Sequence, residues 1–105
     1  MGGGKILMKS IMQEEKECYL CRKLYDAENI QNLQEHHCIH GTANRTLSEL
    51  YGLKVFLCIY HHTQGIGAVH RNRDYDLLLI REAQRKFEER HGHAEFMRVF
   101  RKNYL

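Results

Sequence analysis

Two pairs of metal-binding side chains, each with the same two-residue gap, constrain this 105-residue chain more than any other feature. Cys18 and Cys21 form a C-x-x-C pair. Cys58 and His61 form a C-x-x-H pair directly after a strand-like run. Tetrahedral zinc takes four such donors, and sequences supply them as two close pairs that lie far apart. The spacing therefore predicts one three-Cys, one-His zinc site, which a chain with a small core can use for stability.

Two other interpretations of the cysteines stay open. A C-x-x-C pair also occurs in thioredoxin-like redox proteins, although no strand–helix–strand pattern surrounds this one. Four cysteines can also form two disulfides, but nothing in the sequence indicates secretion, and a cytoplasmic chain keeps its thiols reduced. Cys38 stands alone in an apolar alternation and is expected in the core. We therefore expect a cytoplasmic protein that carries one structural zinc.

The charge distribution permits a nucleic-acid partner without requiring one. The chain has 16 Lys and Arg against 13 Asp and Glu, a net charge of +3. Residues 71–105 hold nine basic and six acidic residues, which accounts for the whole excess. This mild basic bias is compatible with DNA and is also typical of a solvated helix surface. No run of about 18 apolar residues is present, so no membrane-spanning helix is expected.

One domain is expected over residues 16–105, because the length suits a single core and no Pro/Ser-rich linker divides it. Residues 1–15 are expected to form a flexible leader, and the Met-Gly-Gly-Gly-Lys start is not typical of a signal peptide. Apolar periodicity and turn residues predict extended segments alternating with helices. These are an extended segment over 33–39, a helix over 45–51 with Gly52 as its C-cap, a strand over 54–58, a polar connector over 63–73, a helix from Asp74 or Asp76 to about 90, and a last helical segment over 94–100.

Seven of the eight histidines remain once the zinc site is assigned, and their order along the chain is informative. His36 and His37 lie on the first extended segment, and Asn44 lies between the two extended segments. His62 directly follows the C-x-x-H pair, and His70 follows a glycine-bearing loop. The order is thus strand, Asn-bearing loop, strand, C-x-x-H-H and then His.

This order resembles the ββα-metal, or HNH, nuclease superfamily, in which a hairpin and a following helix clasp one catalytic metal. Residues 35–55 (EHHCIHGTANR, then LSE, then YGLKV) are similar to small phage and prophage proteins of the HNH type. They also resemble the catalytic domain of the RecA-dependent nucleases called recombination enhancement function proteins. The similarity continues through residues 68–72 to the tail over 96–105, and covers about residues 16–105. It implies an α+β fold: a small ββα-metal (HNH-like) hairpin–helix core with a zinc knuckle and C-terminal helices.

The resemblance also implies a role for each remaining side chain. His36 would bind the catalytic metal, and His37 would be the general base that takes a proton from the attacking water. Asn44 would orient the His37 segment by hydrogen bonding. His62 would supply the second metal ligand and His70 the third. A divalent metal such as Mg²⁺, Mn²⁺ or Zn²⁺ would polarise the scissile phosphate.

Two points stay open on the sequence alone. His40 is an alternative third ligand, because His70 lies eight residues beyond His62 and a loop must bring it back. The expected function is a metal-dependent DNA endonuclease of phage or prophage type, with a recombinase or another phage or host protein as a further partner. The alternative is a non-catalytic zinc-binding module that docks on nucleic acid or protein. A spare histidine such as His37 favours the nuclease, because a pure zinc module needs none beside a ligand.

Overall fold

The computed structural model describes residues 8–105, which form a small α+β fold around one two-stranded sheet. Strands β1 (Gln34–His37) and β2 (Lys54–Leu57) are antiparallel, with His36 opposite Val55 and His37 opposite Lys54. The expected α+β class is therefore observed. Within residues 8–105, no helix has the length and apolar content to cross a membrane.

Helix α2 (Thr42–Tyr51) connects the two strands and ends at Gly52, the predicted C-cap. Gly52 has a φ of +71°, the left-handed region, and an added Cβ would lie 2.4 Å from the Lys9 carbonyl oxygen. Both facts require glycine there. The helix begins three residues before the predicted start at 45. Gly41 is its N-cap, and the Gly41 carbonyl accepts the first helical hydrogen bond, from the Arg45 amide.

Two short helical segments are absent from the sequence prediction. Helix α1 (Tyr19–Tyr25) and the π-helical turn η1 (Tyr60–Gln64) are each too short to show an apolar period. Helix α1 begins at Cys18, whose thiol caps it by accepting from the Cys21 amide at 3.4 Å. The η1 turn starts shortly after β2, between the predicted strand over 54–58 and the predicted connector over 63–73.

The long helix α3 (Arg73–His91) has Asn72 as its N-cap, so it begins before the predicted starts at Asp74 or Asp76. The Asn72 side chain accepts a hydrogen bond from the Tyr75 amide at 3.1 Å, which satisfies an N-terminal amide of the helix. Both aspartates lie in the first turn, where their charge favours the helix dipole. Helix α4 (His93–Phe100) follows after Gly92, close to the predicted last segment.

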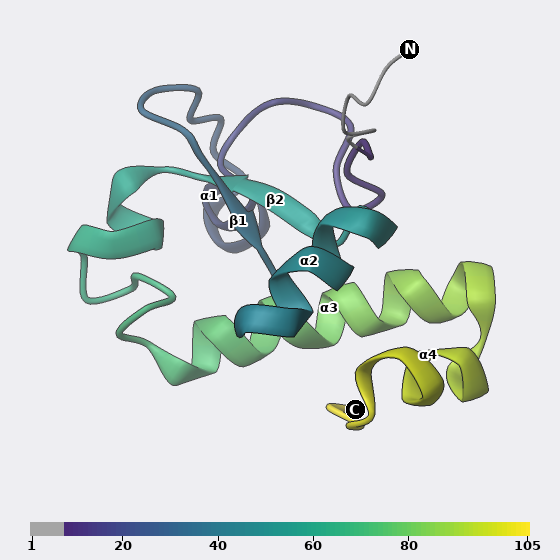
Figure 1. Cartoon of the computed structure of the whole chain (residues 1–105). Helices are drawn as coiled ribbons and strands as arrows, with labels where there is room; N and C mark the ends of the chain where they lie inside the picture. Colours follow the sequence, from purple (N-terminus) through teal and green to yellow (C-terminus); the bar gives the residue numbers. More distant parts are fainter. Residues whose placement is uncertain (1–7) are drawn as a thin grey trace, which may run out of the picture.

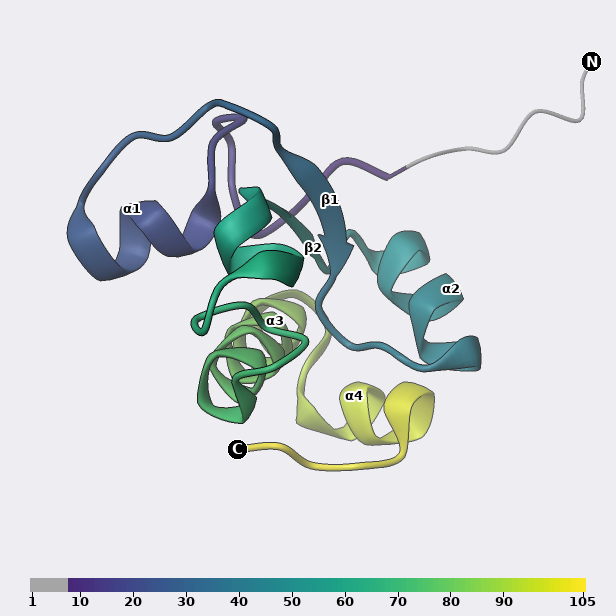
Figure 2. The ribbon, with the colours of Figure 1, turned by 90° about the vertical axis from the view of Figure 1, so that its left-hand side faces the viewer.

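The hairpin lies over α3, and α1 and α2 flank it on opposite sides (Figures 1 and 2). Helix α4 folds back against α3, and the aromatic rings of Tyr51, Phe87, Phe96 and Phe100 pack there at centroid distances of 4.8 to 6.4 Å. Cys38 is fully buried, as predicted for a core residue. The fully buried core also includes Leu20, Ile39, Leu53, Leu57, Leu79 and Ala83.

Part of the expected leader packs on the hairpin. Residues 1–7 lie outside the described residues. The Ser10 hydroxyl donates to the Lys54 carbonyl at 2.5 Å, and the Ile11 amide donates to the Gly52 carbonyl at 2.9 Å. Met12 is buried in the core. The packed part of the chain therefore starts near residue 10, before the expected boundary at 16.

Candidate metal centres

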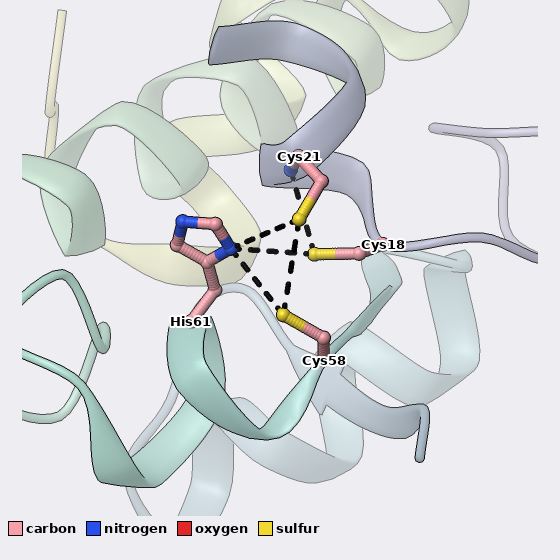
Figure 3. A group of neighbouring side chains, drawn as sticks. All are labelled: Cys18, Cys21, Cys58 and His61. Atoms are coloured by element: carbon pink, nitrogen blue, oxygen red, sulfur yellow. Dashed lines mark hydrogen bonds between the residues drawn. The ribbon is translucent and has the colours of Figure 1, made fainter. Parts of the chain in front are cut away.

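Cys18, Cys21, Cys58 and His61 form one compact group, which we call the quartet (Figure 3). The His61 Nδ1 lies 3.6, 3.4 and 3.5 Å from the sulfurs of Cys18, Cys21 and Cys58, and the Cys21 and Cys58 sulfurs are 3.8 Å apart. A tetrahedral zinc with Zn–S bonds of ~2.3 Å and Zn–N bonds of ~2.0 Å separates its ligands by about 3.8 Å (S to S) and about 3.5 Å (S to N). The quartet can hold a metal ion such as zinc without rearrangement.

Local structure brings the quartet together from two distant segments. Cys18 and Cys21 face each other across the first turn of α1, which is held by the Cys18 cap and by the Cys18 amide on the Asn29 carbonyl at 2.8 Å. Cys58 directly follows the β2 strand, and the amide of His61 donates to its carbonyl at 3.1 Å. Hydrogen bonds to backbone amides therefore hold both knuckles in place.

Burial shifts the protonation equilibria of the quartet. Burial, and then a hydrogen bond with Cys18, raises the pKa of the Cys21 thiol to about 12. Burial lowers the pKa of His61, which keeps its imidazole neutral with a lone pair on offer. Thiols buried this way ionise when a metal supplies the opposing charge. A metal in the quartet would therefore displace the thiol protons as it binds.

His36, His62 and His70 form a second group, which we call the trio. One ring nitrogen from each lies within 4.8 Å of the others. Their ring centroids are 5.4 Å (36 to 62), 5.7 Å (36 to 70) and 4.9 Å (62 to 70) apart. His36 is buried, His62 is half-buried and His70 is exposed. The trio is therefore looser than the quartet and open on one side.

The His36 ring carries the most telling feature of the trio. Within residues 8–105, its Nε2 is the one buried side-chain nitrogen or oxygen without a hydrogen-bond partner. An orphaned buried polar atom costs about 1–3 kcal/mol. Burial, and then the charges of His62 and His70, lower the pKa of His36 to about 3, so this imidazole is neutral at physiological pH. A neutral, unpartnered imidazole facing two others is suited to binding a cation.

Two neighbouring residues of the η1 turn belong to different groups. His61 and His62 are consecutive, and both amides donate to the Cys58 carbonyl, at 3.1 and 2.9 Å. Consecutive residues of a helical turn point in different directions, and here His61 faces the quartet while His62 faces the trio. The other His62 nitrogen, Nδ1, lies 2.6 Å from the Gln34 side-chain oxygen, which fixes the ring. The structure thus divides the two histidines as the sequence analysis expected.

A tight loop brings His70 back to the trio. The Val69 amide donates to the His61 carbonyl at 2.8 Å, which ties the residue before His70 to the η1 turn. At Gly65 an added Cβ would lie 2.5 Å from the Tyr60 carbonyl oxygen, so only glycine permits this path. His40, the alternative ligand, lies outside the trio because its Nε2 is 2.9 Å from a carboxylate oxygen of Asp76.

His37 belongs to a third group, with Glu35 and Glu49. Its Nε2 is 2.9 Å from a Glu49 carboxylate oxygen. The Lys54 ammonium lies 2.7 Å from the other Glu49 oxygen and 3.4 Å from Glu35, so the cation of this group is a lysine of the chain itself. The Asn44 amide donates to the His40 carbonyl at 3.3 Å, and its expected hydrogen bond to the His37 segment is therefore displaced by three residues.

One open hollow of about 340 Å³ joins the trio to the expected base. His37 lines it together with all three trio histidines, and Glu35, His40 and Arg45 complete the lining. Neighbouring residues of an ideal strand point to opposite faces, yet His36 and His37 both reach this hollow because it lies where β1 ends. Sequence reasoning missed Glu49, Lys54 and Asp76, whose contacts depend on how α2, β2 and α3 pack.

Comparison of the chain with models of known families, with curated proteins and with solved structures finds no match.

Proposed function

We propose that this protein is a metal-dependent endonuclease that hydrolyses DNA phosphodiester bonds, with zinc in the quartet and a divalent metal on the trio. The observation that carries the proposal is the trio itself, with its orphaned buried His36 nitrogen beside His37 in one open hollow. A site with three protein ligands leaves positions for water and substrate, whereas a four-ligand site is closed. The resemblance to HNH nucleases supports the same assignment.

The residues of the hollow suit the hydrolysis of a phosphodiester. His36, His62 and His70 would hold a divalent cation, which when bound polarises the phosphate and offsets charge on the leaving oxygen. His37 accepts a proton from the attacking water, a role that histidine takes more often than any other side chain. Arg45 lines the hollow, is exposed and makes no side-chain hydrogen bond or ion pair within residues 8–105, so it is available to a phosphate.

The proposal is tested by a nicking assay on plasmid DNA and on single-stranded DNA with Mg²⁺, Mn²⁺ or Zn²⁺. We expect His37→Ala to abolish cleavage and to leave the zinc content and the melting temperature close to those of the parent. His93→Ala is the matched control, because His93 is exposed and, among residues 8–105, pairs only with Glu88 at the far end of α3. Equal cleavage by His37→Ala and the parent would remove His37 from the reaction.

A non-catalytic zinc module is the competing function, and the quartet alone would support it. Metal analysis separates the two. The nuclease requires more than one metal site per chain at saturating metal, whereas the module requires one tightly held zinc. A single site, with no cleavage under any metal, would favour the module.

A further inference from the structure

Two charged side chains, Glu49 and Lys54, lie beside His37. His37 on β1 is the register partner of Lys54 on β2, and Glu49 reaches both from the last turns of α2. One Glu49 oxygen lies 2.9 Å from the His37 Nε2, and the other lies 2.7 Å from the Lys54 ammonium. Each Glu49 carboxylate oxygen therefore contacts one of the two neighbours.

Lys54 fixes which way this network is polarised. Its side chain is only 7% exposed, and a lysine ammonium can donate hydrogen bonds but cannot accept them. Burial alone would raise the pKa of Glu49, but the hydrogen bonds from Lys54 and His37 outweigh it and hold the pKa below its usual value. Glu49 is thus an ionised carboxylate, which can only accept.

We propose that Glu49, anchored by Lys54, is a positioning residue that holds His37 in the tautomer with its proton on Nε2. An acceptor-only oxygen at hydrogen-bond distance requires the Nε2 to be the donor. The Nδ1 of a neutral His37 then keeps the free lone pair. The tautomer does not depend on the proposed function. The further step, in which Nδ1 takes a proton from water, rests on the proposed function.

The isosteric variant Glu49→Gln makes the inference sharp. Lys54 can only donate, so the single oxygen of the new amide turns toward Lys54 and its NH₂ turns toward His37. The His37 Nε2 must then accept, and the proton moves to Nδ1. Every heavy atom keeps its place, yet the tautomer is reversed.

The tautomer can be read without any cleavage assay. Two-bond ¹H–¹⁵N spectra of the zinc-loaded protein, recorded without DNA at mildly alkaline pH, distinguish the Nε2–H from the Nδ1–H imidazole. We expect Nε2–H for His37 in the parent and Nδ1–H in Glu49→Gln. Adding Lys54→Met should free the amide oxygen for His37 and restore Nε2–H. Glu88→Gln is the matched control, because Glu88 forms a similar pair with His93 at 2.7 Å.

Cleavage supplies the second readout. We expect Glu49→Gln to lower kcat by about 10²–10⁴-fold with little change in KM, as a wrong tautomer does in a serine protease triad. The double variant should recover part of that loss, which a merely structural role of Glu49 would not produce. Nε2–H retained in Glu49→Gln would overturn the inference. If the tautomer reverses in a protein that never cuts DNA, the inference stands and the proposed function fails.

Discussion

The quartet and the trio are built from overlapping segments yet differ in almost every physical property. The quartet has four ligands at tetrahedral distances, and three of its members, Cys18, Cys58 and His61, are buried. The trio has three imidazoles at looser spacing, one of them exposed, around an open hollow. A closed site contributes to folding, and an open one leaves room for chemistry. The η1 turn serves both, since His61 and His62 lie one residue apart on it.

The comparison teaches that one short turn can couple stability to function. Cys58 and His61 fix the start of η1 through the quartet, and the same turn then presents His62 to the trio. A metal in the quartet would therefore order the trio indirectly. We expect the reverse dependence to be weaker, because His70 itself is exposed. Four experiments separate the two roles, from the largest expected effect to the smallest.

The largest effect is expected in the quartet. Cys58→Ser removes one of the four ligands. Binding of a structural zinc is worth about 10–16 kcal/mol in zinc-finger peptides. That is comparable with the whole stability of an ordinary domain, about 5–15 kcal/mol. We expect the variant to lose its cooperative melting transition and its tightly bound zinc, as measured by circular dichroism and metal analysis.

Cys38→Ala is the matched control, because Cys38 is a fully buried thiol outside both metal groups. It should keep its zinc and melt cooperatively, at a cost of about 1–3 kcal/mol for the lost packing. If Cys58→Ser melts like the parent, the quartet does not stabilise the fold and the distinction drawn from the comparison fails.

The trio should respond in the opposite way. His36→Leu keeps an apolar side chain of similar bulk in the buried site and removes the orphaned Nε2, so the unfolding free energy should change by less than about 1.5 kcal/mol. The second metal site and DNA cleavage should both be lost. Metal titration and melting of the same sample measure the two effects together. A variant that unfolds, or that still binds the second metal, would contradict the assignment of His36.

A smaller effect distinguishes the two candidates for the third ligand. We expect His70→Ala to weaken the second metal by about 10-fold or more, because it removes a donor to that metal. His40→Ala should leave the affinity nearly unchanged, since the His40 ring is engaged by Asp76 rather than by the trio. Competition with a metal indicator measures both. The opposite order of affinities would make His40 the ligand.

The sequence predicts the quartet well and the surroundings of the trio poorly, for a physical reason. The gap in C-x-x-C and C-x-x-H is a local constraint, so it survives whatever the rest of the chain does. The contact between His37 and Glu49 instead depends on the register of β1 with β2 and on the rotation of α2. Asn44 shows the same limit, because a helix that starts at Thr42 directs its amide to His40 rather than to His37.

The smallest effect concerns the charges around each group. Beside the quartet, the Arg22 guanidinium is paired with Glu17 at 3.0 Å and with Asp26 at 2.9 Å. Beside the trio, Arg45 and Arg71 are exposed, and neither side chain makes a hydrogen bond or ion pair within residues 8–105. A guanidinium that is already paired with carboxylates of the protein, as Arg22 is, attracts a phosphate only weakly. The difference predicts that DNA lies across the trio and away from the quartet.

Salt dependence of DNA binding measures this asymmetry even without cleavage. For each phosphate contact removed, the slope of log affinity against log salt concentration should flatten by about one. We expect that change for Arg45→Ala and for Arg71→Ala, with additive slopes in the double variant. Arg22→Ala removes the same formal charge beside the quartet and should leave the slope unchanged, because Glu17 and Asp26 already oppose that charge. Equal slopes for all three variants would mean that net charge alone draws DNA to the protein, and the trio would lose its claim to be the face that meets the substrate.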